Sequence, residues 1–359
     1  MTNKRHIAVV TGSRADFGLL QPVLRAIGDE RRLRLSVVVT GTHLTTGTWR
    51  DVAANWTIAA RVPMQRRGHG GRGADVAALG RGITGLGKVF ARLKPDVVLV
   101  LGDRIEALAA GIAAHVGGIH LAHIHGGDRA EGVADEAMRH ALSKLTHIHL
   151  SATQQSRQRL LRMGENPRRV FQVGSPAMDG LREVVPVDTL PFVVVLQHPI
   201  GARPAQERQW MRQTLRATQP YARVLMAPNA DPGHTGIQQA LRATGEPVVE
   251  HLTRQEFLAM VAGASALVGN SSAGLIEAAA LGTPCVNIGP RQAGREKPAN
   301  VIDCGYGVQS VRQALQRALR LCGRRWKHPY GDGQTGPRIA RLLATLDLQR
   351  VPLRKRNSY

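Results

Sequence analysis

Cysteine, aromatic residues and long apolar runs are all scarce in this chain of 359 residues. Its three cysteines are scattered, which excludes a disulfide framework and a cysteine-rich zinc site. No window approaches the roughly 18–20 consecutive apolar residues that a membrane helix needs, and the apolar run at residues 7–10 is too short for a signal peptide. We therefore expect a cytoplasmic protein with no membrane partner.

Acidic residues are also few, with 26 Asp and Glu against 48 Lys and Arg, so the net charge is +22. Such an excess is typical of nucleic-acid-binding proteins. However, only seven of the cations are lysine, the basic residues are spread along the chain, and aromatic side chains for base stacking make up 4%. We attribute the charge to an arginine-favouring composition and expect no nucleic-acid partner. A nucleic-acid-binding module is the alternative, and it predicts a salt-dependent affinity.

Short apolar runs alternate with helix-period segments along the whole chain, as is typical of βαβ units around parallel sheets. Two prolines interrupt this alternation near residues 181–191, where we place a linker. The length and the alternation predict an α/β fold with two Rossmann-like doubly wound domains, residues 1–182 and 191–335, and a cleft between them. The expected strands are residues 7–10, 35–39, 96–101, 119–124, 148–150, 192–196, 223–226, 248–250, 266–268 and 285–288. The expected helices are residues 16–27, 135–145, 205–217, 254–262 and one that begins at Ser272.

The sharpest local signal is the segment 268–278, where a strand ends, two glycines flank hydroxyl residues and a helix is expected. Backbone N–H groups at the helix start and the hydroxyls of Ser271 and Ser272 suit a phosphate or diphosphate. Glu277 follows where a carboxylate could accept hydrogen bonds from ribose hydroxyls. An ordinary N-capped helix is the alternative interpretation.

Two segments in the first half follow predicted strands, where open sheets bind ligands. In residues 11–16, Arg14 could bind an anion, although a helix capped by Asp16 explains the same residues. In residues 101–106, Asp103 follows a buried strand, and packing alone explains such a carboxylate poorly. A glycine-rich basic loop is expected over residues 63–75.

Seven of the 14 histidines fall between residues 115 and 149. His123 and His125 alternate on one strand and could supply two metal ligands, but no third ligand has zinc-like spacing, so we expect no metal. A proton-transfer site formed by Asp103, His125 and Asp135 fits better. For four other histidines of this region, His115, His120, His147 and His149, we expect backbone hydrogen-bond partners.

Three further segments follow predicted strands in the second half and are expected to face the cleft: residues 196–199, 227–231 and 289–295. The third carries Arg291 and Arg295 near the expected phosphate site, which suits the charge of a diphosphate. A solvated loop is the alternative.

Taken together, the motifs of residues 5–310 resemble the hydrolysing UDP-N-acetylglucosamine 2-epimerases of bacterial sialic acid synthesis. The motifs that carry the resemblance are Gly12-Ser13-Arg14-Ala15-Asp16, Leu101-Gly102-Asp103-Arg104, His123-Ile124-His125-Gly126-Gly127, Asp135-Glu136-x-x-Arg139-His140, Gly269-Asn270-Ser271-Ser272-x-Gly274-Leu275-Ile276-Glu277 and Gly289-x-Arg291-Gln292-x-Gly294-Arg295. The resemblance implies GT-B architecture, with a C-terminal helix at about 336–348 that crosses back to the first domain.

The resemblance also implies a reaction and a set of site residues. UDP-GlcNAc and water give ManNAc and UDP by anti elimination to 2-acetamidoglucal, followed by addition of water with inversion at C2, without a cofactor or metal. Assembly into dimers or tetramers is implied as well. The implied catalytic residues are Asp103, His125, Asp135 and Glu136. The implied UDP-binding residues are Arg14, Ser271, Ser272, Glu277 and Arg291, and the implied cleft-lining residues are Arg104, His198 and Asn229.

One position departs from the family pattern, because His125 stands where many relatives carry glutamate. An imidazole therefore takes the place of a third acid–base carboxylate, and the loop at residues 63–75 puts the sugar preference in question. Two alternatives stay open: the same reaction on UDP-2,4-diacetamido-2,4,6-trideoxyglucose, in a legionaminic acid route, and a GT-B glycosyltransferase that would release no free sugar.

Overall fold

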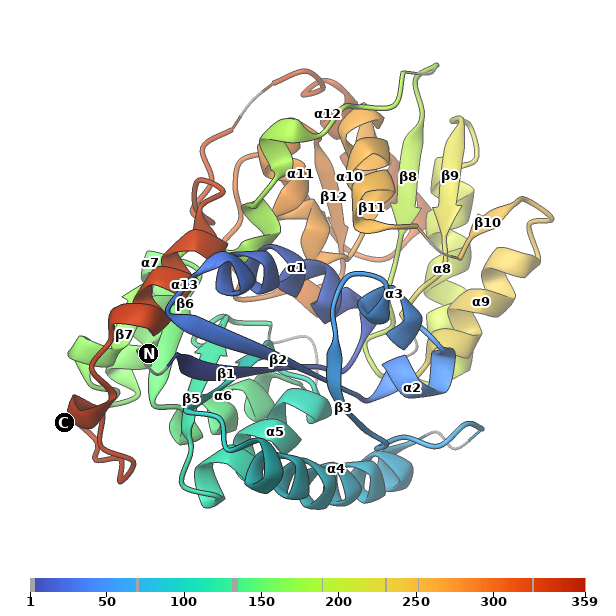
Figure 1. Cartoon of the computed structure of the whole chain (residues 1–359). Coiled ribbons are helices and arrows are strands. Elements are labelled where there is room, and N and C mark those ends of the chain that lie inside the picture. The colour runs from blue at the N-terminus through green and yellow to red at the C-terminus, as the bar shows by residue number, and fades with distance from the viewer. Residues whose placement is uncertain are drawn as a thin grey trace. The chain divides into compact units, whose positions relative to one another are not determined.

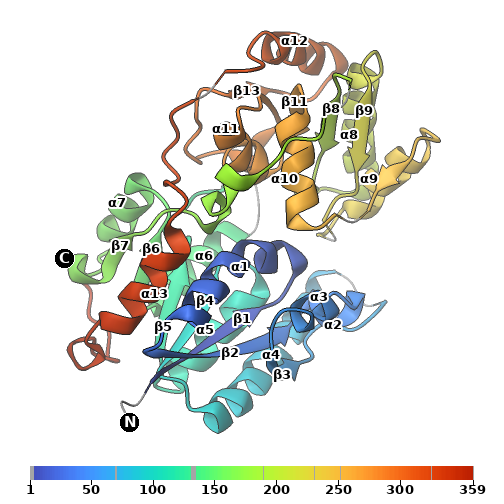
Figure 2. The same cartoon turned by 45° about the horizontal axis from the view of Figure 1, so that its top comes forward.

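The computed structural model describes residues 4–68, 71–130, 135–188, 190–229, 231–250, 252–324 and 326–358. The chain divides into two compact units. Unit 1 holds most of the first 179 residues and the C-terminal segment from Tyr330 onward, and unit 2 holds residues 180–329 with a short segment that begins at Arg129. Figures 1 and 2 show each unit as a sheet covered by helices on both faces.

Unit 1 is built on a parallel sheet of seven strands in the order β3-β2-β1-β4-β5-β6-β7. The strands are β1 (Arg5–Thr11), β2 (Leu33–Thr40), β3 (Ile58–Val62), β4 (Val97–Leu101), β5 (His120–Ile124), β6 (Ile148–Ser151) and β7 (Val170–Gln172). Later strands are added on one side of β1 as β2 and β3, and on its other side as β4 to β7. The topological switch point of this doubly wound sheet therefore lies between β1 and β4.

The two faces of this sheet are covered by different helices, because successive strand residues point to opposite faces. Ile7 and Val9 of β1 pack with α1 and α13, whereas Ala8 and Val10 pack with α4 and α5. Figure 1 shows this division. The helices of unit 1 are α1 (Arg14–Asp29), α2 (Thr42–Thr46), α3 (Trp49–Ala53), α4 (Arg72–Leu93), α5 (Ile105–Val116), α6 (Asp135–Leu145), α7 (Gln154–Arg162) and α13 (Thr335–Thr345), with short 3-10 helices η1 (Pro167–Arg169), η2 (Pro176–Met178) and η6 (Leu348–Arg350).

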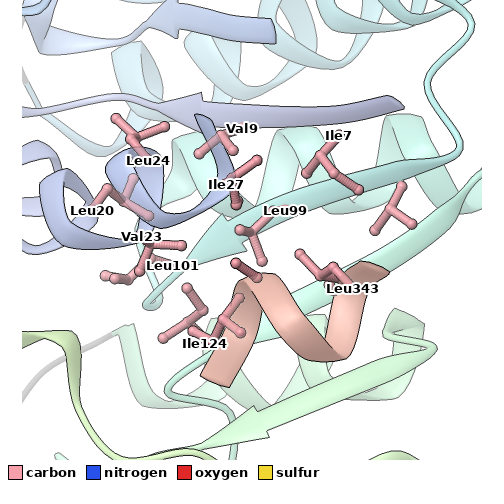
Figure 3. Close-up of a cluster of buried hydrophobic side chains, with 14 of the residues drawn as sticks. Ile7, Val9, Leu20, Val23, Leu24, Ile27, Leu99, Leu101, Ile124 and Leu343 are labelled. Carbon is pink, nitrogen blue, oxygen red and sulfur yellow. The ribbon is translucent and has the colours of Figure 1, made fainter. Parts of the chain in front are cut away.

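The C-terminal helix α13 packs on α1 within unit 1. A glycine makes the close approach possible, since a Cβ at Gly336 would lie 2.6 Å from the Pro22 carbonyl oxygen. Figure 3 shows Leu343 of α13 in the same cluster of buried side chains as Leu99 of β4, Ile124 of β5 and the apolar face of α1. The last segment of the chain therefore completes the hydrophobic core of unit 1.

Unit 2 repeats the design with six parallel strands in the order β10-β9-β8-β11-β12-β13. The strands are β8 (Val193–Leu196), β9 (Arg223–Met226), β10 (Val248–Val249), β11 (Ala266–Gly269), β12 (Cys285–Ile288) and β13 (Val301–Cys304). The helices are α8 (Pro204–Thr218), α9 (His234–Arg242), α10 (Arg254–Gly263), α11 (Glu277–Leu281) and α12 (Val308–Leu319), with short 3-10 helices η3 (Leu181–Glu183), η4 (Ser272–Gly274) and η5 (Pro290–Gln292). Figure 2 shows α10 and α11 on one face of this sheet and α8 and α12 on the other.

The predicted α/β class with two Rossmann-like sheets is confirmed. The apolar runs at residues 223–226 and 285–288 are strands with the predicted bounds. The loop predicted over residues 63–75 is wrong at its end, because α4 begins at Arg72. Its residues His69 and Gly70 lie outside the described residues. Within the described part of the chain, no helix combines the length and apolar character needed to cross a membrane.

Candidate active site

The carboxyl ends of β1, β4 and β5 carry the predicted residues of unit 1. Strands β4 and β5 are direct neighbours, with Leu101 paired to Ile124. The next residues on each strand are therefore close, and the Gly102 N–H donates to the Ile124 carbonyl oxygen over 3.1 Å. Asp103 and His125 thus follow adjacent strand ends, where open α/β sheets bind their ligands.

Asp103 forms an ion pair with Arg139 of helix α6. The Arg139 side chain is only 3% exposed, and its second partner on the same helix is Glu136, 3.9 Å away between Nη1 and Oε2. Two predicted catalytic carboxylates are therefore joined by one buried guanidinium. Such an arrangement fixes the position of each carboxylate and compensates the charge that burial would otherwise penalise.

Asp135 begins helix α6, but its side chain lies outside the described residues. The predicted convergence of Asp103, His125 and Asp135 therefore stays a prediction. Glu136 is the other acidic residue of this helix start, and it also contacts His140, whose Nε2 lies 3.2 Å from its Oε1.

His125 is held on both ring nitrogens inside unit 1. Its Nδ1 lies 2.9 Å from Oδ2 of Asp128, and its Nε2 lies 3.0 Å from Oγ of Ser175. The side chain is 7% exposed. An imidazole placed in this way has a defined orientation, which is a requirement for proton transfer.

His123 bonds the backbone of the turn that precedes Asp103. Its ring is fully buried, its Nε2–H donates to the Gly102 carbonyl oxygen over 2.6 Å, and burial lowers its pKa to about 3. His123 is therefore neutral, and it fixes the turn that carries Asp103. The described residues contain no group of three or more His, Cys, Asp or Glu side chains arranged to hold a metal ion.

Three of the histidines expected to have backbone partners have them. His115, His120 and His147 bond the carbonyl oxygens of Leu145, Val351 and Leu353. The expectation is wrong for His149, whose Nε2 bonds the Glu165 carboxylate over 2.9 Å. Glu165 also binds two lysines of unit 1, so this histidine belongs to a buried ionic network that periodicity could not reveal.

The buried histidines predict an acid-sensitive fold. His123 in unit 1 and His198 in unit 2 both have a pKa of about 3 because burial removes water from the ring, whereas an unfolded histidine titrates near 6.5. Each is uncharged in the folded protein and takes up a proton on unfolding at intermediate pH. The free energy of unfolding should therefore be highest above pH 6.5. As the pH drops below 6.5, it should decrease by about 1.4 kcal/mol per pH unit for each such ring.

His123→Gln should remove one ring from this dependence, because a glutamine amide can still donate to the Gly102 carbonyl oxygen but does not titrate. Urea unfolding between pH 4.5 and 6.5 measures the slope. A variant whose stability fell with acid as steeply as that of the wild type would show that His123 is protonated in the folded state.

Arg14 and Asp16 lie at the start of α1, after β1. Asp16 accepts from the backbone N–H of Gly12 and Ser13 over 2.9 and 2.8 Å, and Ser13 caps the helix in return. The backbone N–H groups that precede the helix are thus bonded by the carboxylate of Asp16. Arg14 is half-buried, and burial lowers the pKa of its guanidinium while the Asp51 carboxylate opposes the shift.

Arg104 is oriented by Glu106, a buried carboxylate of α5. The Arg104 Nε lies 3.4 Å from Glu106 Oε2, and Gln65 Nε2 donates to Glu106 Oε1 over 2.7 Å. Glu106 fills the space beside Gly12, where a Cβ would come 2.5 Å from the Glu106 Cβ. The glycine of the first motif is therefore explained by packing against this carboxylate.

Asn270 joins three loops of unit 2 at the carboxyl ends of β8, β11 and β12. Its Oδ1 accepts from the His198 N–H over 2.7 Å, and its Nδ2 donates to the His198 carbonyl oxygen over 2.8 Å. Its own carbonyl oxygen accepts from Arg291 Nη1 and Gln292 Nε2 over 3.3 and 2.9 Å. The predicted residues His198 and Arg291 are thus brought together by one buried amide.

His198 is a neutral donor in this arrangement. Burial, together with the nearby Arg291 charge, lowers its pKa to about 3. Its Nδ1 accepts the backbone N–H of Asn229 over 3.1 Å, so the ring proton is on Nε2. A fixed Nε2–H and the Arg291 guanidinium are the groups that bind phosphate oxygens well. The Asn229 backbone, rather than its side chain, makes the contact.

The α-helix predicted to begin at Ser272 is wrong. Residues 272–274 form the 3-10 helix η4, capped by the Ser271 hydroxyl, and α11 begins only at Glu277. In this turn the Gly274 carbonyl oxygen accepts from the Asn300 side-chain amide over 3.0 Å. The predicted phosphate site at Ser271 and Ser272 stays a prediction.

Glu277 is buried and faces Arg254 of α10. Its Oε1 lies 3.5 Å from Arg254 Nη1, and its side chain is 8% exposed. The ribose contact predicted for Glu277 stays a prediction.

Residue-by-residue prediction missed four members of these clusters: Arg139, Asp128, Ser175 and Asn270. Arg139 lies four residues after Asp135, on the helix spacing that could have paired it with the site. Asp128 lies three residues after His125. Nothing in the sequence places Ser175 or Asn270 against residues 50 and 72 positions away.

Comparison with known proteins gives consistent matches. A family model described as UDP-N-acetylglucosamine 2-epimerase matches residues 25–344. A Legionella pneumophila protein named UDP-N,N'-diacetylbacillosamine 2-epimerase (hydrolyzing) is 34% identical and covers 99% of this chain and all of its own length. A Neisseria meningitidis protein named UDP-N-acetylglucosamine 2-epimerase is 32% identical over 88% of each chain. The crystal structure of UDP-GlcNAc 2-epimerase from Neisseria meningitidis bound to UDP-GlcNAc covers 94% of this chain and 99% of its own, with a TM-score of 0.80 at 18% identity, a likeness of fold alone.

Proposed function

We propose, from the premise that this chain belongs to the UDP-N-acetylglucosamine 2-epimerase family, that it is a hydrolysing 2-epimerase. Its reaction converts UDP-GlcNAc and water into ManNAc and UDP. The first step removes the C2 proton while the C1–O bond to UDP breaks, which leaves a C1–C2 double bond. The second step adds a hydroxyl at C1 and a proton at C2 on the opposite face, which inverts C2.

The observation that supports this chemistry best is the Asp103–Arg139–Glu136 cluster. The C2 proton is not adjacent to a carbonyl carbon, so its removal needs a base held in position. A carboxylate fixed by a buried guanidinium at a strand end is such a base. We assign proton removal to Asp103, with Asp135 as the other candidate, and assign assistance of water addition to His125 or Glu136.

UDP binding is assigned to the residues of unit 2. The neutral His198 Nε2–H, the Arg291 guanidinium and the Ser271 and Ser272 hydroxyls would hold the diphosphate, and Glu277 would accept from the ribose. These donors would also stabilise the charge that develops on UDP as it leaves. Arg14 and Arg104 of unit 1 and Asn229 of unit 2 are proposed as further contacts of the same substrate.

A second substrate is supported by one comparison. The Legionella pneumophila relative that matches this chain along its full length is named for UDP-N,N'-diacetylbacillosamine, a sugar with an acetamido group at C4 as well as at C2. The elimination and hydration at C1 and C2 would be the same for both sugars. The C4 and C6 substituents alone distinguish the candidates.

A parallel assay of both substrates tests the proposal. UDP release is followed continuously, and the sugar product is identified by NMR and mass spectrometry. The proposal predicts stoichiometric UDP and a free 2-epimerised sugar from at least one substrate. A UDP-linked epimer without free UDP would refute the hydrolysing reaction, and sugar transfer to an added acceptor would favour a glycosyltransferase. The predicted dimer or tetramer and the cytoplasmic location stay predictions.

A further inference from the structure

Asp128 and Ser175 each form a hydrogen bond with one of the two ring nitrogens of His125. Asp128 Oδ2 lies 2.9 Å from the imidazole Nδ1, and Ser175 Oγ lies 3.0 Å from Nε2. The other carboxylate oxygen, Oδ1 of Asp128, accepts from the Ser156 hydroxyl over 2.6 Å. Asp128 is 4% exposed and Ser175 is fully buried.

The partners of His125 fix where its proton is. An ionised carboxylate can only accept, so the imidazole Nδ1 must carry the hydrogen that bonds Asp128. Ser175 Oγ already accepts the Ala177 N–H over 3.2 Å, and its own hydrogen is then available to Nε2. The ring is therefore the Nδ1–H tautomer, and Nε2 is its basic atom.

The backbone conformation of His125 also supports a functional role for its hydrogen bonds to Asp128 and Ser175. Its φ is +69°, a left-handed conformation that costs energy in any residue but glycine, and Lys94 is the one other non-glycine residue of the described chain that adopts it. In this conformation the His125 N–H donates to the Leu150 carbonyl oxygen over 3.1 Å, which ties the residue to strand β6. Strain of this kind persists where the structure needs one side-chain direction.

We propose that Asp128 is the positioning residue of His125, and that Ser175 is the resting partner of Nε2, which exchanges the proton in the proposed reaction. This inference rests on the proposed function. Asp128 would hold the ring in one orientation and stabilise the imidazolium after Nε2 has taken a proton. Ser175 would occupy Nε2 until substrate or water replaces its hydroxyl.

Nitrogen-15 NMR of the wild-type protein tests the tautomer without any turnover. The His125 signals are those missing from the spectrum of His125→Gln. The inference predicts a protonated Nδ1 and an unprotonated Nε2, and Asp128→Ala should shift the proton toward Nε2. A wild-type ring with its proton on Nε2 would overturn the inference even if the proposed reaction is correct. Conversely, a protein that turned over neither UDP-sugar could still show the predicted tautomer.

Kinetics separate positioning from a structural role. Asp128→Asn should lower kcat at least about tenfold with little change in KM, because the shape stays but the charge facing the imidazolium is lost. Ser175→Ala should lower kcat less than Asp128→Asn does, since it removes a partner of Nε2 and leaves the charge that faces the imidazolium in place. Ser156→Ala is the matched control for a lost hydrogen bond to the same buried carboxylate, and melting temperatures of all variants report folding. Wild-type kcat in Asp128→Asn, or equal losses in Asp128→Asn and Ser175→Ala, would overturn the assignment.

Discussion

Asp103→Asn should lower kcat by about a thousandfold or more, because the amide keeps the size of the carboxylate but cannot take the C2 proton. The substitution also removes the ion pair with the buried Arg139, which has Glu136 at 3.9 Å as a further acidic neighbour among the described residues. Some loss of stability should therefore accompany the loss of turnover. Initial rates of UDP release and the melting temperature measure the two effects separately.

Asp29→Asn is a suitable control for Asp103→Asn. Asp29 is the exposed last residue of α1, where a negative charge gains nothing from the helix dipole. Its turnover should match that of the wild type. If Asp103→Asn bound UDP, melted as the control does and still turned over normally, Asp103 would not be the base, and Asp135 would take its place in the mechanism.

Asn270→Asp should weaken UDP binding at least about tenfold. A carboxylate cannot donate to the His198 carbonyl oxygen, which now accepts from the amide over 2.8 Å, and two oxygens would face each other in a buried site. The loop that carries His198 should then lose its support, whereas Arg291 bonds the main-chain carbonyl oxygen of residue 270, which the substitution leaves in place. A cost of about 1–3 kcal/mol in the free energy of unfolding is expected for the lost hydrogen bond. Calorimetric titration with UDP measures the affinity, and urea unfolding measures the free energy of unfolding.

Thr283→Val separates these two effects for Asn270. The Thr283 hydroxyl is buried in unit 2 and donates to the Val261 carbonyl oxygen over 2.7 Å. Its loss should destabilise the unit by a similar amount and leave the affinity for UDP unchanged. Equal weakening of UDP binding in both variants would mean that Asn270 acts through general stability and not through His198.

The central strands of both sheets could be predicted from the sequence because they are buried on both faces and read as continuous apolar runs. Three of the four edge strands, β3, β7 and β13, could not, whereas the edge strand β10 was predicted at residues 248–250. β13 has the sequence Val301-Ile302-Asp303-Cys304 and is partly exposed, and β3 is paired on one side only, so neither has the apolar signature of a central strand. Helix α4 was not predicted, and the loop predicted over residues 63–75 overlaps its start, because glycines surround Arg72 and glycine is a weak helix former.

The candidate site was predictable to the extent that its residues follow strands. Asp103, His125 and His198 were found by that rule, and the resemblance to the hydrolysing epimerases that the motifs indicate is confirmed at the level of the family. Arg139 has a helix spacing from Asp135 that was not used, whereas Ser175 and Asn270 reach their partners only through the tertiary fold. The helix expected at Ser272 was wrong, because residues 272–274 form a 3-10 helix whose Gly274 carbonyl oxygen also bonds the distant Asn300 side chain.

Conversion of the UDP-sugar in D2O is the most direct test of the account. In the proposed reaction the substrate loses its C2 proton and UDP together and then regains a proton from solvent. NMR of the released sugar should show deuterium at C2 in every molecule formed, with the configuration at C2 inverted. A released sugar that kept its original hydrogen at C2 would contradict the elimination and, with it, the role of Asp103.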